Sequence, residues 1–437
     1  MAKGFLQRKA AWEILLKVSS GIYSDLALEK VLRNYKFNQL DIAFITEISF
    51  GCIRYRKLLD LWIDHTSKLP HIKQPPKLRW LLHIGLYQLL KMDKVPYSAA
   101  ISTSVEVAKQ TDLKGLSGAI NAILRNASRK LQDKNFPIIP NNNIDRISYK
   151  ESIPNWLVKE IIDWFGLEKA SNIAASFNKR PTIDLRINPL KASVDEIIKD
   201  LQKEDIQASK INNLKNGIQL TTKSRSIRDL PGYEEGKWVI QDRSSQWVST
   251  LLDPKKGEKI LDACAAPGSK TTHIAEIIED NGEIWAFDRS EVRLKILKEN
   301  LKRLNIKSVQ VHQQDSMNLS NVKPALRCYF DKILIDAPCS GIGTFSRNPD
   351  ARWSLNKSKI NQLISLQEKL LNCLFPLLKK KGKLVYSTCT ICPGENNLLI
   401  KKFLKNNNHI NLISEKQIYP SYASPGDGFY AAVMTYK

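Results

Sequence analysis

The chain has 437 residues, of which 43% are hydrophobic and 25% are charged, and both values are ordinary for a globular protein. This length exceeds a single hydrophobic core and predicts two or three domains. The chain has no apolar run of about eighteen residues, and its N-terminus lacks the apolar core of a secretory signal, so we expect neither a membrane span nor export. The net charge of +23 favours a polyanionic partner such as a nucleic acid.

The seven cysteines indicate a reducing compartment. Their number is odd and no secretory signal precedes them, so we expect free thiols and a cytoplasmic location. Cys389 and Cys392 have the C-x-x-C spacing that occurs in zinc and redox sites. A structural zinc site needs four ligands and no second pair follows, and the surroundings of a thioredoxin-like pair are missing. We therefore predict no metal.

Residues 1–143 are predicted to form an all-α domain. Apolar residues recur at helical spacing in five segments, with glycine or proline at the breaks between them: 5–18, 40–63, 78–90, 98–108 and 113–131. The stretch 136–143, rich in proline and asparagine, then has the composition of a linker.

The predicted secondary structure of the remaining chain changes twice, at residue 144 and at residue 237. Residues 144–236 are predicted to be a small α+β module, with a helix at 154–165 and a strand at 182–187. From residue 237 short strands alternate with helices such as 291–304 and 359–378. The strands are expected at 259–262, 283–288, 308–312, 331–336, 382–387 and 429–436. This alternation predicts a Rossmann-like α/β domain with a parallel sheet, whose ligands bind at the carboxyl ends of the strands.

A loop of small residues, from Asp262 to Lys270, follows the first of these strands and precedes a helix. A ligand can approach such a backbone closely and meet the free amides of the helix N-terminus. Asp288, Asp315 and Asp336 follow or end the next three strands and are expected to ring the same pocket with acceptor oxygens. The chain has neither G-x-G-x-x-G nor the triphosphate loop, so the pocket suits a positively charged nucleoside, S-adenosylmethionine.

Two cysteines follow neighbouring strands of the predicted sheet. Cys339 follows the fourth strand and Cys389 follows the fifth, so both thiols should face the pocket. Carbon 5 of cytosine is a poor nucleophile, but a thiolate that adds to carbon 6 makes carbon 5 able to attack a sulfonium methyl group. An acid must act at ring nitrogen 3, for which Asp336 is placed, and a base must later take the proton from carbon 5. Position alone leaves open which cysteine attacks.

These motifs resemble those of the RNA 5-methylcytosine methyltransferases of the NOL1/NOP2/Sun family. The resemblance rests on the loop 262–270, on Asp336-Ala-Pro-Cys-Ser-Gly and on Ser387-Thr-Cys. It implies that Cys389 is the nucleophile and that Cys339 assists release of the methylated base. It also implies a set of cofactor-binding residues: Cys264, Ala265, Ala266, Pro267, Gly268, Ser269, Lys270, Asp288, Asp315 and Asp336. Ser269 replaces a glycine that is usual in this family, which predicts a slightly stiffer loop.

The rest of the chain extends the resemblance. Segments 95–100 and 120–125 are similar to a NusB-like helical domain, which precedes the catalytic part in the bacterial members that methylate 16S ribosomal RNA, and 152–157, 185–188, 239–244 and 427–430 are similar to later parts. The implied domains are a NusB-like RNA-binding domain (1–143), a linker or RNA-binding module (144–236) and an S-adenosylmethionine-dependent methyltransferase domain (237–437). We therefore expect a monomeric, cytoplasmic enzyme that methylates carbon 5 of one cytosine in free or partly assembled 16S ribosomal RNA. Transfer RNA as the substrate and a non-catalytic RNA-binding factor are the alternatives.

Overall fold

The computed structural model describes residues 4–221, 227–319, 326–421 and 426–437. It divides into two compact units. Unit 1 contains Met1–Lys179 together with Arg347–Ser354, and unit 2 contains Arg180–Ser346 together with Leu355–Lys437. The chain therefore leaves unit 2 after Ser346 and returns to it at Leu355.

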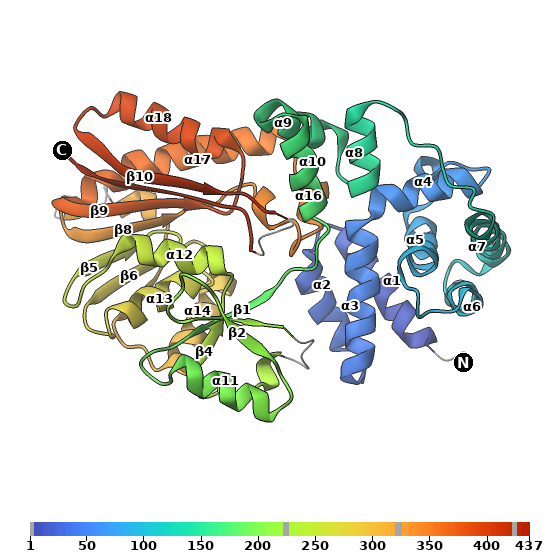
Figure 1. The fold of residues 1–437 in the computed structure, drawn as a ribbon, viewed down its shortest axis with the longest axis horizontal. Coiled ribbons are helices and arrows are strands. Elements are labelled where there is room, and N and C mark those ends of the chain that lie inside the picture. Colours follow the sequence, from blue (N-terminus) through green and yellow to red (C-terminus); the bar gives the residue numbers. More distant parts are fainter. Residues whose placement is uncertain (1–3, 222–226, 320–325, 422–425) are drawn as a thin grey trace. The chain divides into compact units, whose positions relative to one another are not determined.

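The described part of unit 1 is helical, as predicted (Figure 1). In chain order its helices are α1 (Phe5–Ser19), α2 (Ser24–Leu32), α3 (Gln39–Arg54), α4 (Arg56–Thr66), η1 (His71–Lys73), α5 (Pro76–Lys91), α6 (Tyr97–Lys109), η2 (Lys114–Leu116), α7 (Ser117–Gln132), α8 (Asn143–Glu151), α9 (Asn155–Phe165), α10 (Leu167–Ser176) and α16 (Ala351–Ser354). The buried faces of α1 to α7 form one hydrophobic core.

Two predictions about these helices were wrong. The segment 40–63 is not one helix, because the chain leaves helical geometry at Tyr55, which separates α3 from α4. The sequence analysis also missed α2, because this helix buries only Ser24, Ala27 and Val31 and so carries little apolar periodicity.

A short segment from late in the chain completes unit 1. The Arg352 side chain is fully buried, and its guanidinium donates to the carbonyl oxygen of Phe177 at 3.1 Å and to Oδ1 of Asn178 at 3.1 Å. The indole of Trp353 donates to the carbonyl oxygen of Ile53 at 2.7 Å. Buried carbonyl groups need such donors, so the segment is an integral part of this unit.

Unit 2 contains a small α+β module, but the helix predicted for it at 154–165 is α9 (Asn155–Phe165) and belongs to unit 1, which extends to Lys179. The sheet of this module has four antiparallel strands in the order β2-β3-β1-β4. The elements are β1 (Ile183–Ile187), α11 (Val194–Lys203), β2 (Ala208–Lys210), β3 (Gly217–Leu220), η3 (Ile227–Asp229) and β4 (Trp238–Ile240).

Among the residues that the structure describes, the large sheet of unit 2 has seven strands in the order β10-β11-β9-β8-β5-β6-β7. Figure 1 labels five of these strands, which are β10, β9, β8, β5 and β6. The seven strands are β5 (Lys259–Asp262), β6 (Glu283–Asp288), β7 (Val309–Gln313), β8 (Phe330–Asp336), β9 (Leu378–Thr388), β10 (Ile410–Ile418) and β11 (Phe429–Tyr436). The five strands from β5 to β9 are parallel, which confirms the Rossmann-like prediction. The sheet is mixed, however, because β10 and β11 run antiparallel. The sequence analysis missed β10, which is mostly exposed and lacks an apolar pattern.

Helices cover both faces of this sheet. Side chains of α17 and α18 pack on one face, and those of α12, α13 and α14 pack on the other. The bounds of the elements between the strands are α12 (Arg243–Leu252), α13 (Ser269–Ile277), α14 (Glu291–Leu304), η4 (Ser316–Asn318), η6 (Ile342–Thr344), α17 (Lys357–Leu374), η7 (Phe375–Leu377), η8 (Pro393–Glu395) and α18 (Asn397–Asn406). Because helices cover both faces of the sheet, a ligand is expected to bind at the carboxyl ends of the parallel strands. Within the described ranges, the search for a helix long and apolar enough to cross a bilayer found none.

Candidate active site

A cavity of about 480 Å³ lies at the carboxyl ends of the parallel strands. This volume is within the usual range for a small-molecule site. Its lining residues are Ala263, Cys264, Ala266, Asp288, Arg289, Ser290, Arg293, Gln314, Asp315, Ser316, Asp336, Ala337, Pro338, Cys339, Leu366, Leu370 and Cys389. The structure thus brings into one cavity the three carboxylates and the two cysteines that the sequence analysis assigned to a single pocket.

The loop after β5 turns sharply into α13 at Gly268. The φ angle of Gly268 is +105°, and a Cβ atom there would lie 2.3 Å from Cδ1 of Leu297, so only glycine fits. Of the loop residues expected to bind a cofactor, Cys264 and Ala266 line the cavity. Five others do not appear in its lining: Ala265, Pro267, Gly268, Ser269 and Lys270.

Asp288 and Asp315 line the cavity and also support its walls. Asp288 accepts hydrogen bonds from the backbone N–H groups of Ala266 at 3.2 Å and Ser290 at 2.9 Å, which ties the loop to the end of β6. Asp315 accepts from the N–H of Met317 at 3.0 Å and pairs with Arg289 at 2.7 Å. A carboxylate has about four acceptor positions, so both groups keep capacity for a ligand.

Asp336 stands at the end of β8 with a cation beside it. Its Oδ2 atom lies 2.7 Å from Nζ of Lys270, and its Oδ1 atom accepts from the hydroxyl of Ser387 at 2.9 Å. Asp262 lies behind them, fully buried, and accepts from the hydroxyl of Thr271 at 2.7 Å. Burial, with a contribution from the charge of Asp336, raises the pKa of Asp262 to about 7. Lys270 does not line the cavity, but it forms an ion pair with Asp336, which does.

The two cysteine sulfur atoms lie 3.4 Å apart. The hydrogen bond with Cys389 is the largest cause that raises the pKa of Cys339 well above its usual value, and burial and the charge of Glu395 act in the same direction. The raised pKa favours the protonated form of Cys339, and the 3.4 Å contact allows either thiol to donate.

The buried Glu395 connects the loop that carries Cys339 to the loop that carries Cys389. Glu395, on η8, is fully buried, and its carboxylate accepts from the backbone N–H of Ser340 at 2.8 Å and from the hydroxyl of the same residue. That hydroxyl lies 2.7 Å from the hydroxyl of Thr390. Ser340 follows Cys339 and Thr390 follows Cys389, so this network fixes both sulfur atoms. The sequence analysis missed Glu395, because no local pattern marks it.

The α+β module contributes directly to the cofactor loop. Arg186 on β1 is fully buried, and it donates to the carbonyl oxygen of Ser269 at 2.7 Å and to both carboxylate oxygens of Glu276 at 2.8 Å. The sequence analysis gave this module no role at the site. Arg289 and Arg293, which line the cavity, were also missed, although they lie just after the predicted strand that ends at Asp288.

Of the C-x-x-C pair, Cys389 contacts the sulfur of Cys339, and Cys392 is buried. A search of the described residues for three or more His, Cys, Asp or Glu side chains arranged to hold a metal ion found no such group.

Three family models together match most of the chain. Residues 6–129 match the NusB family, residues 153–226 match the ferredoxin-like domain of RsmF/B-like methyltransferases, and residues 249–435 match the 16S rRNA methyltransferase RsmB/F model. The probable ribosomal RNA small subunit methyltransferase B of Synechocystis sp. is 41% identical over 88% of this chain and 85% of its own length. The chain belongs to the RsmB/F family of 16S rRNA methyltransferases.

Other comparisons agree with this family. Ribosomal RNA small subunit methyltransferase B of Escherichia coli O7:K1 is 35% identical over 92% of each chain. The crystal structure of the protein PH0851 matches with a TM-score of 0.85 and 25% identity, covering 100% of this chain and 99% of that one. The NOL1/NOP2/Sun resemblance, the NusB-like first domain and the methyltransferase domain are thereby confirmed.

Proposed function

We propose that this RsmB/F family member transfers a methyl group from S-adenosylmethionine to carbon 5 of a cytosine in 16S ribosomal RNA, through a covalent adduct between Cys389 and carbon 6. The observation that carries the proposal is the Cys339–Cys389 pair, with its sulfur atoms 3.4 Å apart, in a cavity also lined by Asp288, Asp315 and Asp336. Covalent catalysis requires a thiol beside the methyl donor, and this cavity offers two.

The cavity suits a nucleoside that carries a positive charge. Asp288 at the end of β6 is placed to accept hydrogen bonds from ribose hydroxyls. Gly268 opens the way to the amides at the start of α13, and the lining carboxylates favour a cationic ligand. S-adenosylmethionine, when bound, supplies the methyl group as an electrophile.

The hydrogen bond between the cysteines favours Cys389 as the nucleophile. The raised pKa of Cys339 favours its protonated form, and an S–H group there stabilises negative charge on the Cys389 sulfur. In the proposed step the Cys389 thiolate forms a bond to carbon 6 of cytosine, and the electron pair of the double bond between carbons 5 and 6 forms a bond from carbon 5 to the methyl group. The bond from that methyl group to the sulfonium sulfur breaks, and S-adenosylhomocysteine is the leaving group. Asp336, paired with Lys270, is the group placed to act at ring nitrogen 3.

The same coupling assists the release of the product. Once Cys389 is bonded to carbon 6, its sulfur no longer carries negative charge, and the largest cause of the raised pKa of Cys339 disappears. Cys339 can then release its own proton to solvent, and the resulting thiolate acts as the base that removes the proton from carbon 5. Loss of that proton restores the double bond between carbons 5 and 6 as the bond to Cys389 breaks.

The substrate class follows from the family and the charge. Relatives named ribosomal RNA small subunit methyltransferase B match over most of this chain, and its net charge of +23 suits an RNA partner. We propose that the enzyme acts in the cytoplasm, as a monomer, on RNA that is free or only partly assembled. An unpaired cytosine should react best, since the base must leave any stack to reach the cysteines.

Bisulfite sequencing of RNA tests the substrate. Cells that lack this protein should lose one 5-methylcytosine from 16S ribosomal RNA, and a copy encoding the wild-type chain should restore it. A 5-methylcytosine lost from transfer RNA instead would establish transfer RNA as the substrate. A complete 5-methylcytosine profile in both RNA classes would favour a non-catalytic RNA-binding factor.

The cofactor assignment predicts that Asp288→Ala weakens binding of S-adenosylmethionine. Hydrogen bonds to a charged acceptor contribute about 1.5–3 kcal/mol, so the dissociation constant should rise by roughly 10- to 100-fold. Isothermal titration calorimetry measures this change. Asp195→Ala is the matched control, because Asp195 is an exposed carboxylate of the same unit whose side chain is 70% accessible. Equal affinities in the two variants would remove Asp288 from the cofactor site.

A further inference from the structure

Unit 1 contains a second cavity, of about 440 Å³, whose walls combine aromatic rings with a guanidinium group. We call it the Arg56 pocket and define it by six of its lining residues: Tyr23, Arg56, Arg79, Trp80, Asp350 and Trp353. All six belong to unit 1, and none takes part in the chemistry proposed above.

Arg56 is held between two tryptophan rings. Its Cζ atom lies 5.6 Å from the ring centroid of Trp80 and 5.4 Å from that of Trp353. These cation–π contacts orient the guanidinium but use none of its N–H donors. Within the described ranges, no carboxylate or carbonyl oxygen accepts a hydrogen bond from Arg56. Burial is the largest cause that lowers the pKa of Arg56 and the neighbouring Arg79 adds to it, whereas the charge of Asp60 acts in the opposite direction, so the positive charge of Arg56 is only partly compensated within the protein.

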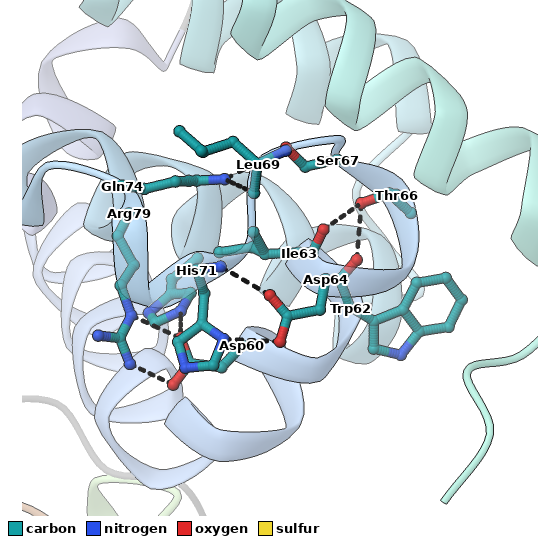
Figure 2. Close-up of polar contacts among 11 residues, drawn as sticks. Asp60, Trp62, Ile63, Asp64, Thr66, Ser67, Leu69, His71, Gln74 and Arg79 are labelled. Carbon is teal, nitrogen blue, oxygen red and sulfur yellow. Dashed lines mark hydrogen bonds and ion pairs between the residues drawn. The ribbon is translucent and has the colours of Figure 1, made fainter.

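The other two charged side chains of the pocket, Arg79 and Asp350, already have hydrogen-bond partners. Figure 2 shows Arg79 bonded to both carboxylate oxygens of Asp60. The distance between Nε of Arg79 and Oδ1 of Asp60 is 2.6 Å, and the side chain of His83 makes a third contact with Asp60 at 2.8 Å. Asp350 accepts hydrogen bonds from the hydroxyl of Ser24 at 2.8 Å and from its backbone N–H at 3.2 Å, at the positive end of α2. Among the described residues, Arg56 is therefore the cationic side chain of the pocket that has no carboxylate acceptor.

Tyr23 supplies a free aromatic surface at the same pocket. Its side chain is 63% exposed, although it is a large ring that burial would stabilise. Its hydroxyl has no hydrogen-bond partner among the residues that the structure describes. Exposed aromatic rings beside an arginine form a stacking platform for nucleobases, and such platforms tolerate any sequence.

We propose that the Arg56 pocket binds one unpaired nucleotide of the substrate RNA, with its phosphate on Arg56 and its base stacked on Tyr23. This inference rests on RNA as the substrate and adds to it a contact outside the methyltransferase site. Unit 1 would thus recognise single-stranded character near the target, in addition to attracting RNA by charge.

The test uses the full-length enzyme and a short RNA oligonucleotide, either single-stranded or annealed to its complement. Fluorescence anisotropy should show that Tyr23→Ala and Arg56→Gln each raise the dissociation constant of the single strand by about tenfold. Arg56→Gln should also reduce the slope of log K against log salt by about 0.7, the value for one phosphate contact in a single strand, whereas Tyr23→Ala should leave that slope unchanged. Affinity for the duplex should stay the same in both.

Matched controls make the test specific. Arg33→Gln removes an equally positive, 74% exposed side chain from unit 1, and Tyr97→Ala removes another exposed ring of that unit. Both should bind the single strand as the wild type does. If Arg56→Gln does not fold, Tyr23→Ala alone tests the proposal, because Tyr23 is largely exposed and its replacement should not disturb the fold.

Wild-type affinity for the single strand in the folded Tyr23 and Arg56 variants would overturn the proposal. So would an equal loss in the control variants, or a loss of binding to partly assembled ribosomal subunits with unchanged binding to naked RNA, which would indicate a protein partner. Methyl transfer by the wild-type enzyme is measured separately. Its absence would refute the proposed function without altering the outcome of the binding comparison.

Discussion

Cys389→Ala is expected to abolish both methyl transfer and covalent capture of RNA, whereas Cys339→Ala is expected to trap the enzyme on its substrate. The first variant lacks the sulfur that attacks carbon 6. The second retains that sulfur and can accept the methyl group, but it lacks the base proposed to remove the proton from carbon 5. The adduct between Cys389 and carbon 6 should then accumulate.

A denaturing gel distinguishes these outcomes when labelled RNA and S-adenosylmethionine are present. A band of reduced mobility should appear with Cys339→Ala and be absent with Cys389→Ala. Cys373→Ala is the control, because Cys373 lies on α17 and does not line the cavity, and it should behave as the wild type. A trapped band with Cys389→Ala alone would exchange the two roles, and no band with either variant would contradict the covalent mechanism.

The second large effect concerns Arg186, which joins the α+β module to the cofactor loop. Arg186→Met leaves Glu276 buried without its cation, and this is expected to lower the free energy of unfolding of unit 2 by about 3–5 kcal/mol. The carbonyl oxygen of Ser269 also loses its donor, so the affinity for S-adenosylmethionine should fall as well. Urea denaturation and calorimetry measure the two effects.

A double variant shows whether the stability lost in Arg186→Met comes from the buried, unpaired charge of Glu276. Arg186→Met combined with Glu276→Met removes both buried charges and should recover most of the lost stability. Lys256→Met is the control, because the Lys256–Glu279 pair is exposed and exposed pairs contribute at most about 1 kcal/mol. If the double variant were as unstable as Arg186→Met, the lost stability would not come from the unpaired carboxylate.

The sequence predicted those strands of unit 2 that have a clear local apolar pattern, and it predicted which residues meet at their carboxyl ends. Strands β5, β6 and β11 have the predicted bounds, because each is a short apolar run between turn residues. The meeting of Cys339 and Cys389 followed from the neighbouring positions of β8 and β9, since parallel strands present their carboxyl ends at one edge.

The missed contacts depend on residues with no local signature. Arg186, Glu395 and Arg352 are charged side chains, which are normally excluded from a protein interior, and each forms hydrogen bonds with partners distant in the sequence. Periodicity detects faces of helices and strands, but it carries no information about which distant carbonyl or N–H group a charged side chain will meet. The Arg56 pocket was missed for the same reason, since it joins residues from separate helices and a late segment.

The segment 347–354 has a consequence for the order in which the chain folds during synthesis. Unit 1 begins at the N-terminus, yet Arg352 and Trp353 supply donors to carbonyl oxygens of Phe177 and Ile53. The ribosome must therefore extend the chain past residue 354 before the N-terminal unit can be completed. The carbonyl oxygens of Phe177 and Ile53 therefore lack these donors while residues 180–346 of unit 2 are translated.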